Sequence, residues 1–138
     1  MRFLPFVLSF LLLTTSVTFA ESYNYISAEQ MKAKITSGDD MIVVDIQEEK
    51  DFKQHHLPGS IATYAYPVKT ESERAAIDKA VTRYNETGQQ VVIVCPRGQG
   101  GAKRCYDYMK SQKVPEEKLT ILENGMGGWP YPEVVEGQ

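Results

Sequence analysis

Apolar positions along the chain fall into alternating strand-like and helix-like segments. Residues 41–45 (MIVVD) and 91–94 (VVIV) are runs rich in Val and Ile without polar alternation, which is typical of strands buried on both faces of a parallel sheet. Apolar residues at helical spacing predict a helix over residues 71–86. The remaining predicted helices cover residues 28–37, 48–55 and 102–112, and the remaining predicted strands cover residues 60–63 and 118–122.

Capping and turn residues support several of these boundaries. Ser27 and Gln30 form a capping box at the start of the first helix, and Gly38 follows its end. Gly88 closes the helix predicted over residues 71–86. The alternation of strands and helices predicts an α/β sandwich with a mainly parallel central sheet, and no internal repeat or linker divides it.

Residues 1–20 have the pattern of a secretory signal peptide. Arg2 supplies a positive charge, residues 3–13 are apolar but too short to span a bilayer, and Thr18 and Ala20 are the small residues of a cleavage site. An uncleaved anchor or a core helix is the alternative, which the polar stretch at residues 14–16 disfavours. We therefore expect a mature domain of residues 21–138, periplasmic or secreted, without a stable membrane anchor.

Length and charge limit the function further. A chain of 138 residues with 42% hydrophobic content allows one ordinary domain with its own core. The formal net charge of −3 and the lack of a basic block in the sequence give no electrostatic footprint for nucleic acid.

The strongest chemical signal lies at residues 91–109, where a buried strand ends on Cys95 and turns through glycines into a helix. Loop amides and the positive end of a helix dipole form an anion-binding cradle in such a turn, and a cysteine at its mouth is expected to be a reactive thiolate. Arg97 is the best candidate to steer an anionic substrate. The predicted substrate-binding residues are Arg97, Gly98, Gln99, Gly100, Gly101 and Ala102.

Ligands of open α/β sheets bind beyond the carboxyl ends of the strands. Asp45 and Cys95 each end a predicted strand, and the glycine-rich segment 124–129 follows a third. We therefore expect these three regions on one edge of the sheet. Asp45 is predicted to orient loop amides or to cap the helix near Glu48, and Trp129 to plug the core at this edge.

Three stretches together resemble a rhodanese-like domain. The first is residues 43–61, with the strand aspartate, an acidic-aromatic pair at residues 51–52 and the turn His56-Leu57-Pro58-Gly59. The second is the Cys95 loop, and the third is the segment GMGGWP at residues 125–130. The resemblance implies a three-layer sandwich and a sulfurtransferase whose loop cysteine carries a persulfide. It spans residues 27–130, most of the predicted mature domain.

The chain departs from the family pattern at several positions. Pro96, which has no N–H group, stands where a basic residue usually follows the cysteine, and Arg97 is displaced by one place. Gly100 and Gly101 replace a polar pair. Gln47 stands where an arginine commonly follows the strand aspartate.

The predicted reaction moves sulfane sulfur from thiosulfate, a polysulfide or a persulfide through Cys95 to cyanide, a thiol or a protein acceptor. A non-catalytic sulfur carrier or protein-binding module is the main alternative, and a thiol-redox role would require an accessible Cys105. Phosphatase chemistry is disfavoured, because Gly101 stands six residues after Cys95, where an arginine would clamp the phosphate.

The other candidate ligands have structural interpretations. Cys105 is predicted to be a buried helix residue without a disulfide to Cys95, because one cysteine starts the loop and the other lies well inside the helix. His55 and His56 are adjacent and lack a ligand cluster, so we interpret them as structural. The sequence implies no metal and no organic cofactor.

Overall fold

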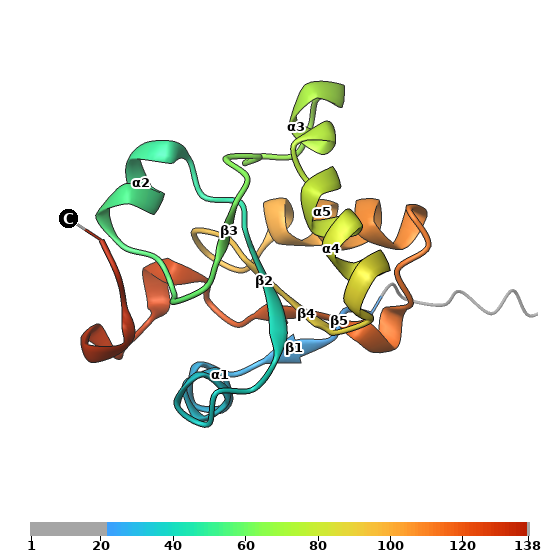
Figure 1. Cartoon of the computed structure of the whole chain (residues 1–138). Helices are drawn as coiled ribbons and strands as arrows, with labels where there is room; N and C mark the ends of the chain where they lie inside the picture. Colours follow the sequence, from blue (N-terminus) through green and yellow to red (C-terminus); the bar gives the residue numbers. More distant parts are fainter. Residues whose placement is uncertain (1–21, 138) are drawn as a thin grey trace, which may run out of the picture.

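The computed structural model describes residues 22–137, and a five-stranded sheet lies at its centre (Figure 1). All strand pairs are parallel, in the order β1-β5-β4-β2-β3. The strands are β1 (Tyr25–Ile26), β2 (Met41–Asp45), β3 (Ile61–Ala62), β4 (Gln90–Val94) and β5 (Leu119–Leu122). The predicted α/β class is confirmed, because helices flank this parallel sheet on both faces.

Helix α1 covers one face of the sheet, and α4 and α5 cover the other (Figure 1). The helices are α1 (Ala28–Thr36), α2 (Glu49–Gln54), α3 (Glu71–Ala75), α4 (Asp78–Thr87) and α5 (Gly100–Ser111). Three short 3-10 turns are η1 (Glu116–Lys118), η2 (Met126–Gly128) and η3 (Pro132–Val134). The predicted capping box is present, because Ser27 Oγ accepts from the Gln30 amide and Gln30 Oε1 accepts from the Ser27 amide.

Alternate residues of the central strands face two separate cores. Val44 of β2 and Ile93 of β4 pack on the α4 and α5 side, whereas Val43 and Val92 pack with Met31 of α1. These strand residues are at most 2% exposed. The continuous apolar runs in the sequence therefore reflect strands buried on both faces.

The helix predicted over residues 71–86 is two helices in the structure, so this prediction was wrong in one respect. Between α3 and α4 the Ile77 amide donates to the Arg74 carbonyl, which is the tighter i→i+3 pattern. The Ile77 side chain is fully buried. The bend therefore inserts Ile77 into the core, and helical spacing alone does not reveal it. Gly88 ends α4 with φ +63°, as predicted.

Most other element ends agree with the sequence prediction to within one residue, and two larger differences remain. Strand β1 was missed, because a two-residue strand carries no periodicity and exists only through its parallel pairing with β5. Helix α5 begins at Gly100, two residues earlier than predicted. Among residues 22–137, none of the helices is long and apolar enough to cross a membrane. The predicted signal peptide lies outside the described residues and stays a prediction.

Candidate functional site

Cys95 follows the last residue of β4 at the carboxyl edge of the sheet. Its side chain is 1% exposed, and its Sγ atom accepts a hydrogen bond from the Gly98 amide at 2.8 Å. Gly98 has φ +70°, a backbone conformation that turns this amide back toward the sulfur and that side chains rarely adopt. The four-residue loop 96–99 therefore presents a backbone donor directly to the thiol.

Backbone hydrogen bonds join the segment after β5 to the Cys95 loop. The Met126 amide donates to the Cys95 carbonyl and the Gly127 amide donates to the Pro96 carbonyl, both at 2.9 Å. A Cβ atom at Gly125 would lie 2.1 Å from the Cys95 carbonyl oxygen, so only glycine allows this approach. The expectation that this segment shares an edge with Cys95 is confirmed. Trp129 packs against the second core and does not line the hollow described next.

A hollow of about 250 Å³ opens above Cys95, and we name it the Cys95 hollow. Tyr66, Cys95, Arg97, Gln99, Gly100, Gly101 and Arg104 line it. Four of the six predicted substrate-binding residues are among these. The other two do not line the hollow. The Gly98 amide donates to Cys95 Sγ, and Ala102 is fully buried in the core.

Helix α5 directs its amino terminus at the Cys95 hollow. Gly100 and Gly101 are its first residues and line the hollow. The amides at a helix start have no acceptor within the helix, and the helix dipole is positive there. This end of α5 therefore favours negative charge next to Cys95.

Tyr66, which comes from the segment between β3 and α3, was not among the predicted site residues. Its amide donates to the Ile46 carbonyl, and its ring lies over the start of α5, where a Cβ atom at Gly101 would be 2.8 Å from it. Tyr66 is 37% exposed. No local pattern marks this residue, because only the tertiary fold brings the segment across the hollow.

Arg104 also lines the hollow, although it was not among the predicted substrate-binding residues. It lies one helical turn after Gly100, and its Nε donates to the Pro67 carbonyl at 2.9 Å. Its Nη1 atom is 3.0 Å from the position a Cβ would take at Gly100. The i, i+4 spacing from Gly100 to Arg104 is the sequence signal that indicates a shared helix face.

Asp45 ends β2 and is fully buried next to the loop that leads to α2. Its Oδ1 accepts from the Gln47 amide at 2.8 Å and its Oδ2 from the Gln47 side chain at 3.0 Å. Burial raises the pKa of Asp45 to about 6. The hydrogen bonds from Gln47 and the nearby His56 lower this pKa, but burial has the larger effect. Asp45 therefore orients a loop amide, as predicted, but it does not cap α2, whose N-cap is Glu48 without a side-chain bond.

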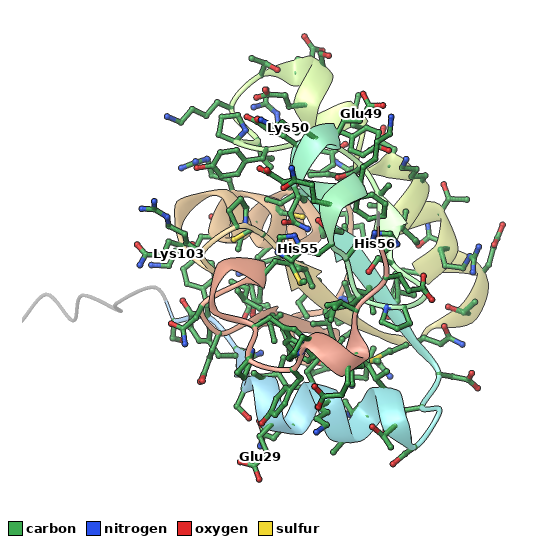
Figure 2. The ribbon with its side chains drawn as sticks, turned by 90° about the vertical axis from the view of Figure 1, so that its left-hand side faces the viewer. Glu29, Glu49, Lys50, His55, His56 and Lys103 are labelled. Atoms are coloured by element: carbon green, nitrogen blue, oxygen red, sulfur yellow. The ribbon has the colours of Figure 1, made fainter. Side chains whose placement is uncertain are left out.

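The two histidines lie close to α2 on the side of the molecule that Figure 2 faces. The His56 ring stacks on Phe52 with centroids 4.0 Å apart, and its Nδ1 is 2.8 Å from the Phe52 carbonyl oxygen. The Gln47 side chain donates to the His55 carbonyl. Within residues 22–137, no group of three potential metal ligands is present. The contacts of His56 are those of a structural residue.

Cys105 and Cys95 are both free thiols, and Cys105 is fully buried, as predicted. Burial raises the pKa of the Cys105 thiol well above its ordinary value, and the nearby Cys95 raises it further. Cys105 is thus a neutral packing residue behind the site.

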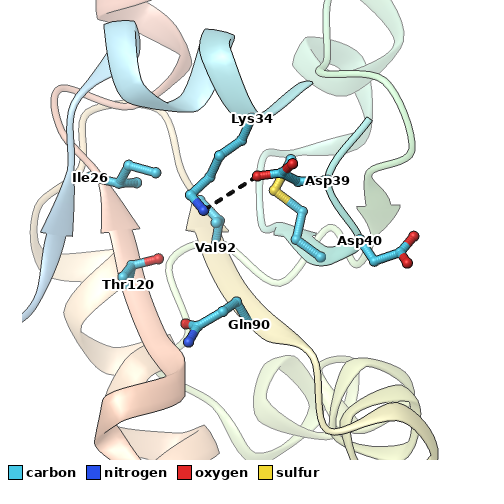
Figure 3. Close-up of a pocket in the computed structure, with 8 residues that line it drawn as sticks. Ile26, Lys34, Asp39, Asp40, Gln90, Val92 and Thr120 are labelled. Carbon is cyan, nitrogen blue, oxygen red and sulfur yellow. Dashed lines mark ion pairs between the residues drawn. The ribbon is translucent and has the colours of Figure 1, made fainter. Parts of the chain in front are cut away.

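A second hollow of about 240 Å³ lies at the amino ends of the strands (Figure 3). Val92 and Ile26 form its apolar floor, and Lys34 and Asp39 form an ion pair at its rim with Nζ and Oδ2 3.7 Å apart. The residues that line it, all in the described part of the chain, include no cysteine or histidine. Cys95, the candidate nucleophile, lies at the other edge.

The model of the rhodanese-like domain family matches residues 27–130. This match covers most of the chain and includes the edge that carries Cys95. The chain therefore belongs to the rhodanese-like domain family.

Comparison with individual proteins gives more distant similarities. The chain is 27% identical over 115 residues to arsenate reductase 2.1 of rice (Oryza sativa subsp. japonica), across 80% of this chain and 69% of that protein. A rhodanese-like domain from Anabaena sp. superposes with a TM-score of 0.59 at 14% identity, covering 85% of this chain and 81% of its own. The As-Sb reductase of Leishmania major gives a TM-score of 0.65 at 16% identity, with 85% and 87% coverage. At these identities the two structures support the fold alone.

Proposed function

We propose that this protein is a sulfurtransferase that carries sulfane sulfur as a persulfide on Cys95. The observation that carries the proposal is the bond from the Gly98 amide to Cys95 Sγ inside a hollow that also receives the amino terminus of α5. A thiolate and, after transfer, a terminal persulfide sulfur are both anions, and backbone donors stabilise both.

The reaction has two steps. The Cys95 thiolate attacks the sulfane sulfur of a donor such as thiosulfate, a polysulfide or a persulfide. A sulfur–sulfur bond forms at Cys95, and the bond to the rest of the donor breaks. Cyanide or a thiol then removes the terminal sulfur and restores the thiolate. Neither step needs a general base, which agrees with the location of Asp45 outside the Cys95 hollow.

A second candidate function is a carrier or protein-binding module without efficient turnover. The observation that favours it is the replacement of an amide donor by Pro96 at the first loop position after Cys95. Such a module would accept sulfur, or a partner protein, at the same edge of the sheet. Turnover with a donor and cyanide separates the two functions.

The test is the intact mass of the purified protein after incubation with thiosulfate or, separately, inorganic polysulfide, followed by cyanide. We expect a gain of one sulfur on Cys95 that cyanide removes as thiocyanate, and continued thiocyanate production when donor and cyanide are both in excess. Cys95→Ser is expected to abolish the gain, because no nucleophile remains in the hollow.

Cys105→Ala is the matched control, because it removes the other thiol from the core and leaves the hollow lining unchanged. Full loading of Cys95→Ser would overturn the proposal. A single loading without turnover would favour the carrier module, and arsenite production from arsenate without sulfur loading would assign the site to oxyanion reduction. The mass of protein recovered after export also tests the proposed signal peptide, because cleavage after Ala20 leaves Glu21 at the amino terminus.

A further inference from the structure

The Cys95 hollow contains positive charge without a compensating acid. Two of its lining residues, Arg97 and Arg104, carry guanidinium groups, and none of its lining residues carries a carboxylate. The amino terminus of α5 adds its dipole to the same space. A molecule that enters this hollow therefore meets a field that favours anions.

The two arginines differ in how firmly they are held. Arg97 is an exposed loop residue. Arg104 is partly buried, and its Nε–H group is fixed on the Pro67 carbonyl at 2.9 Å. This single bond leaves the two Nη groups of Arg104 without a protein acceptor among the described residues. A guanidinium anchored by one edge presents its other donors in a fixed geometry, so less freedom is lost when an anion binds.

The free edge of Arg104 lies beside the start of α5. Its Nη1 and Nη2 atoms are 3.0 and 3.4 Å from the position a Cβ would take at Gly100. Gly100 therefore leaves the guanidinium room to lie against the helix terminus. Arg104, at the ninth position after Cys95, therefore brings a guanidinium group to the hollow, whereas the sixth position is occupied by Gly101.

We propose that Arg104 determines donor specificity, by binding the oxyanion head of sulfane donors while Cys95 attacks the sulfane sulfur. This inference rests on the proposed sulfurtransferase function and specifies its substrate class. A planar guanidinium binds two oxygens of a sulfonate-like group at once, whereas a polysulfide offers no oxygen to bind.

The first step balances with thiosulfate as the donor. The Cys95 thiolate and the thiosulfate dianion give the Cys95 persulfide anion and the sulfite dianion. The new bond joins Sγ to the sulfane sulfur, and the electron pair of the old sulfur–sulfur bond leaves on sulfite. No proton, external oxidant or reductant is consumed. Arg104 contacts the oxygens that remain on the departing sulfite, so it acts on this step and not on the persulfide itself.

The experiment compares the rates at which thiosulfate and inorganic polysulfide load Cys95 in the wild type, Arg104→Gln and Arg104→Lys. We expect Arg104→Gln to slow loading by thiosulfate about tenfold or more, the scale of a lost charge-assisted hydrogen bond, and loading by polysulfide less than about twofold. Arg104→Lys is expected to lie between, because it keeps the charge and loses the two-pronged geometry.

Lys103→Gln is the matched control. It removes one positive charge from the neighbouring position, where Nζ lies 5.5 Å from the centre of the Tyr23 ring and the side chain projects from the margin of the molecule (Figure 2). We expect no change in donor preference. Thermal unfolding of each variant separates lost folding from lost recognition, and Arg104→Lys decides the question if Arg104→Gln unfolds.

The inference would be overturned if Arg104→Gln slowed loading by thiosulfate and by polysulfide equally. It would also be overturned if Lys103→Gln slowed loading by thiosulfate as much as Arg104→Gln does. A wild type that loads with polysulfide but not with thiosulfate would overturn the inference alone and leave the sulfurtransferase proposal intact. A wild type that loads with neither donor would remove the proposed function, and the inference with it.

Discussion

The two edges of the parallel sheet are built from the same strands but have opposite character. At the carboxyl edge, Gly98 and Gly125 bring backbone into contact around Cys95. At the amino edge, Lys34 and Asp39 form a half-exposed ion pair over an apolar floor (Figure 3). Backbone packs closely against backbone at the carboxyl edge, whereas the ion pair at the amino edge joins two half-exposed side chains.

This difference follows from strand direction. All five strands run in parallel, so their carboxyl ends collect loops that lead into helix amino termini, where amides are unpaired and the dipole is positive. The candidate nucleophile Cys95 lies at this edge, and the surface ion pair of Lys34 and Asp39 lies at the opposite one. The comparison predicts that substitutions at the carboxyl edge are costly and that equivalent substitutions at the amino edge are not.

The largest effect on stability is expected at Gly125. Gly125→Ala places a Cβ 2.1 Å from the Cys95 carbonyl oxygen at a residue with φ +58°. Left-handed backbone and overpacking together should lower the free energy of unfolding by about 3 kcal/mol or more. Urea unfolding measures this loss, and sulfur loading of the folded fraction should fall as well.

Gly88→Ala is the matched variant near the amino edge. Gly88 precedes β4 and has φ +63°, but a Cβ there would meet nothing within 4 Å. We expect the free energy of unfolding to fall by about 1 kcal/mol, because of the backbone conformation alone. Sulfur loading of Cys95 should be unchanged. Equal losses in the two variants would show that the carboxyl edge has no special packing demand.

A second expected effect concerns pH and Asp45. Because burial raises the pKa of Asp45 from 3.8 to about 6, the folded protein binds this proton more tightly than the unfolded chain does. Asp45 therefore costs stability as pH rises through the window from about 4 to about 6, by up to about 3 kcal/mol. Asp45→Asn cannot ionise and should not show this cost.

The measurement is the free energy of unfolding of wild type and Asp45→Asn at pH 4, 5, 6 and 7. The difference between the two proteins should shift in favour of Asp45→Asn as pH rises and level off near pH 7. Parallel profiles would mean that Asp45 ionises alike in the folded and unfolded chains. Comparison with the variant cancels the contributions of other carboxyl groups.

The smallest effect is expected at the amino edge. Asp39→Asn breaks the pair with Lys34, whose atoms are 3.7 Å apart on half-exposed side chains. Exposed pairs contribute little, so the free energy of unfolding should change by less than about 0.5 kcal/mol. Loading of Cys95 should match that of the wild type. A marked loss of loading would break the contrast between the two edges.

Several elements were predictable because their signal is local. The run at residues 41–45 is strand β2 residue for residue, and the capping box at Ser27 and Gln30 is present. The split at Ile77 was not predictable, because helical spacing continues through the bend and only core packing selects it. Strand β1 was likewise not predictable, because its two residues form a strand only through their pairing with β5.

The same distinction between local sequence signals and tertiary packing applies to the candidate site. The sequence by itself determined the nucleophile candidate Cys95, the glycines that follow it and the positive helix terminus, because strand, turn and helix are contiguous in the chain. Only the tertiary structure decided that Tyr66 covers Gly101 and that the Pro67 carbonyl anchors Arg104. Those contacts join segments more than 30 positions apart, and their geometry depends on how helices and loops pack over a parallel sheet, which no local pattern encodes.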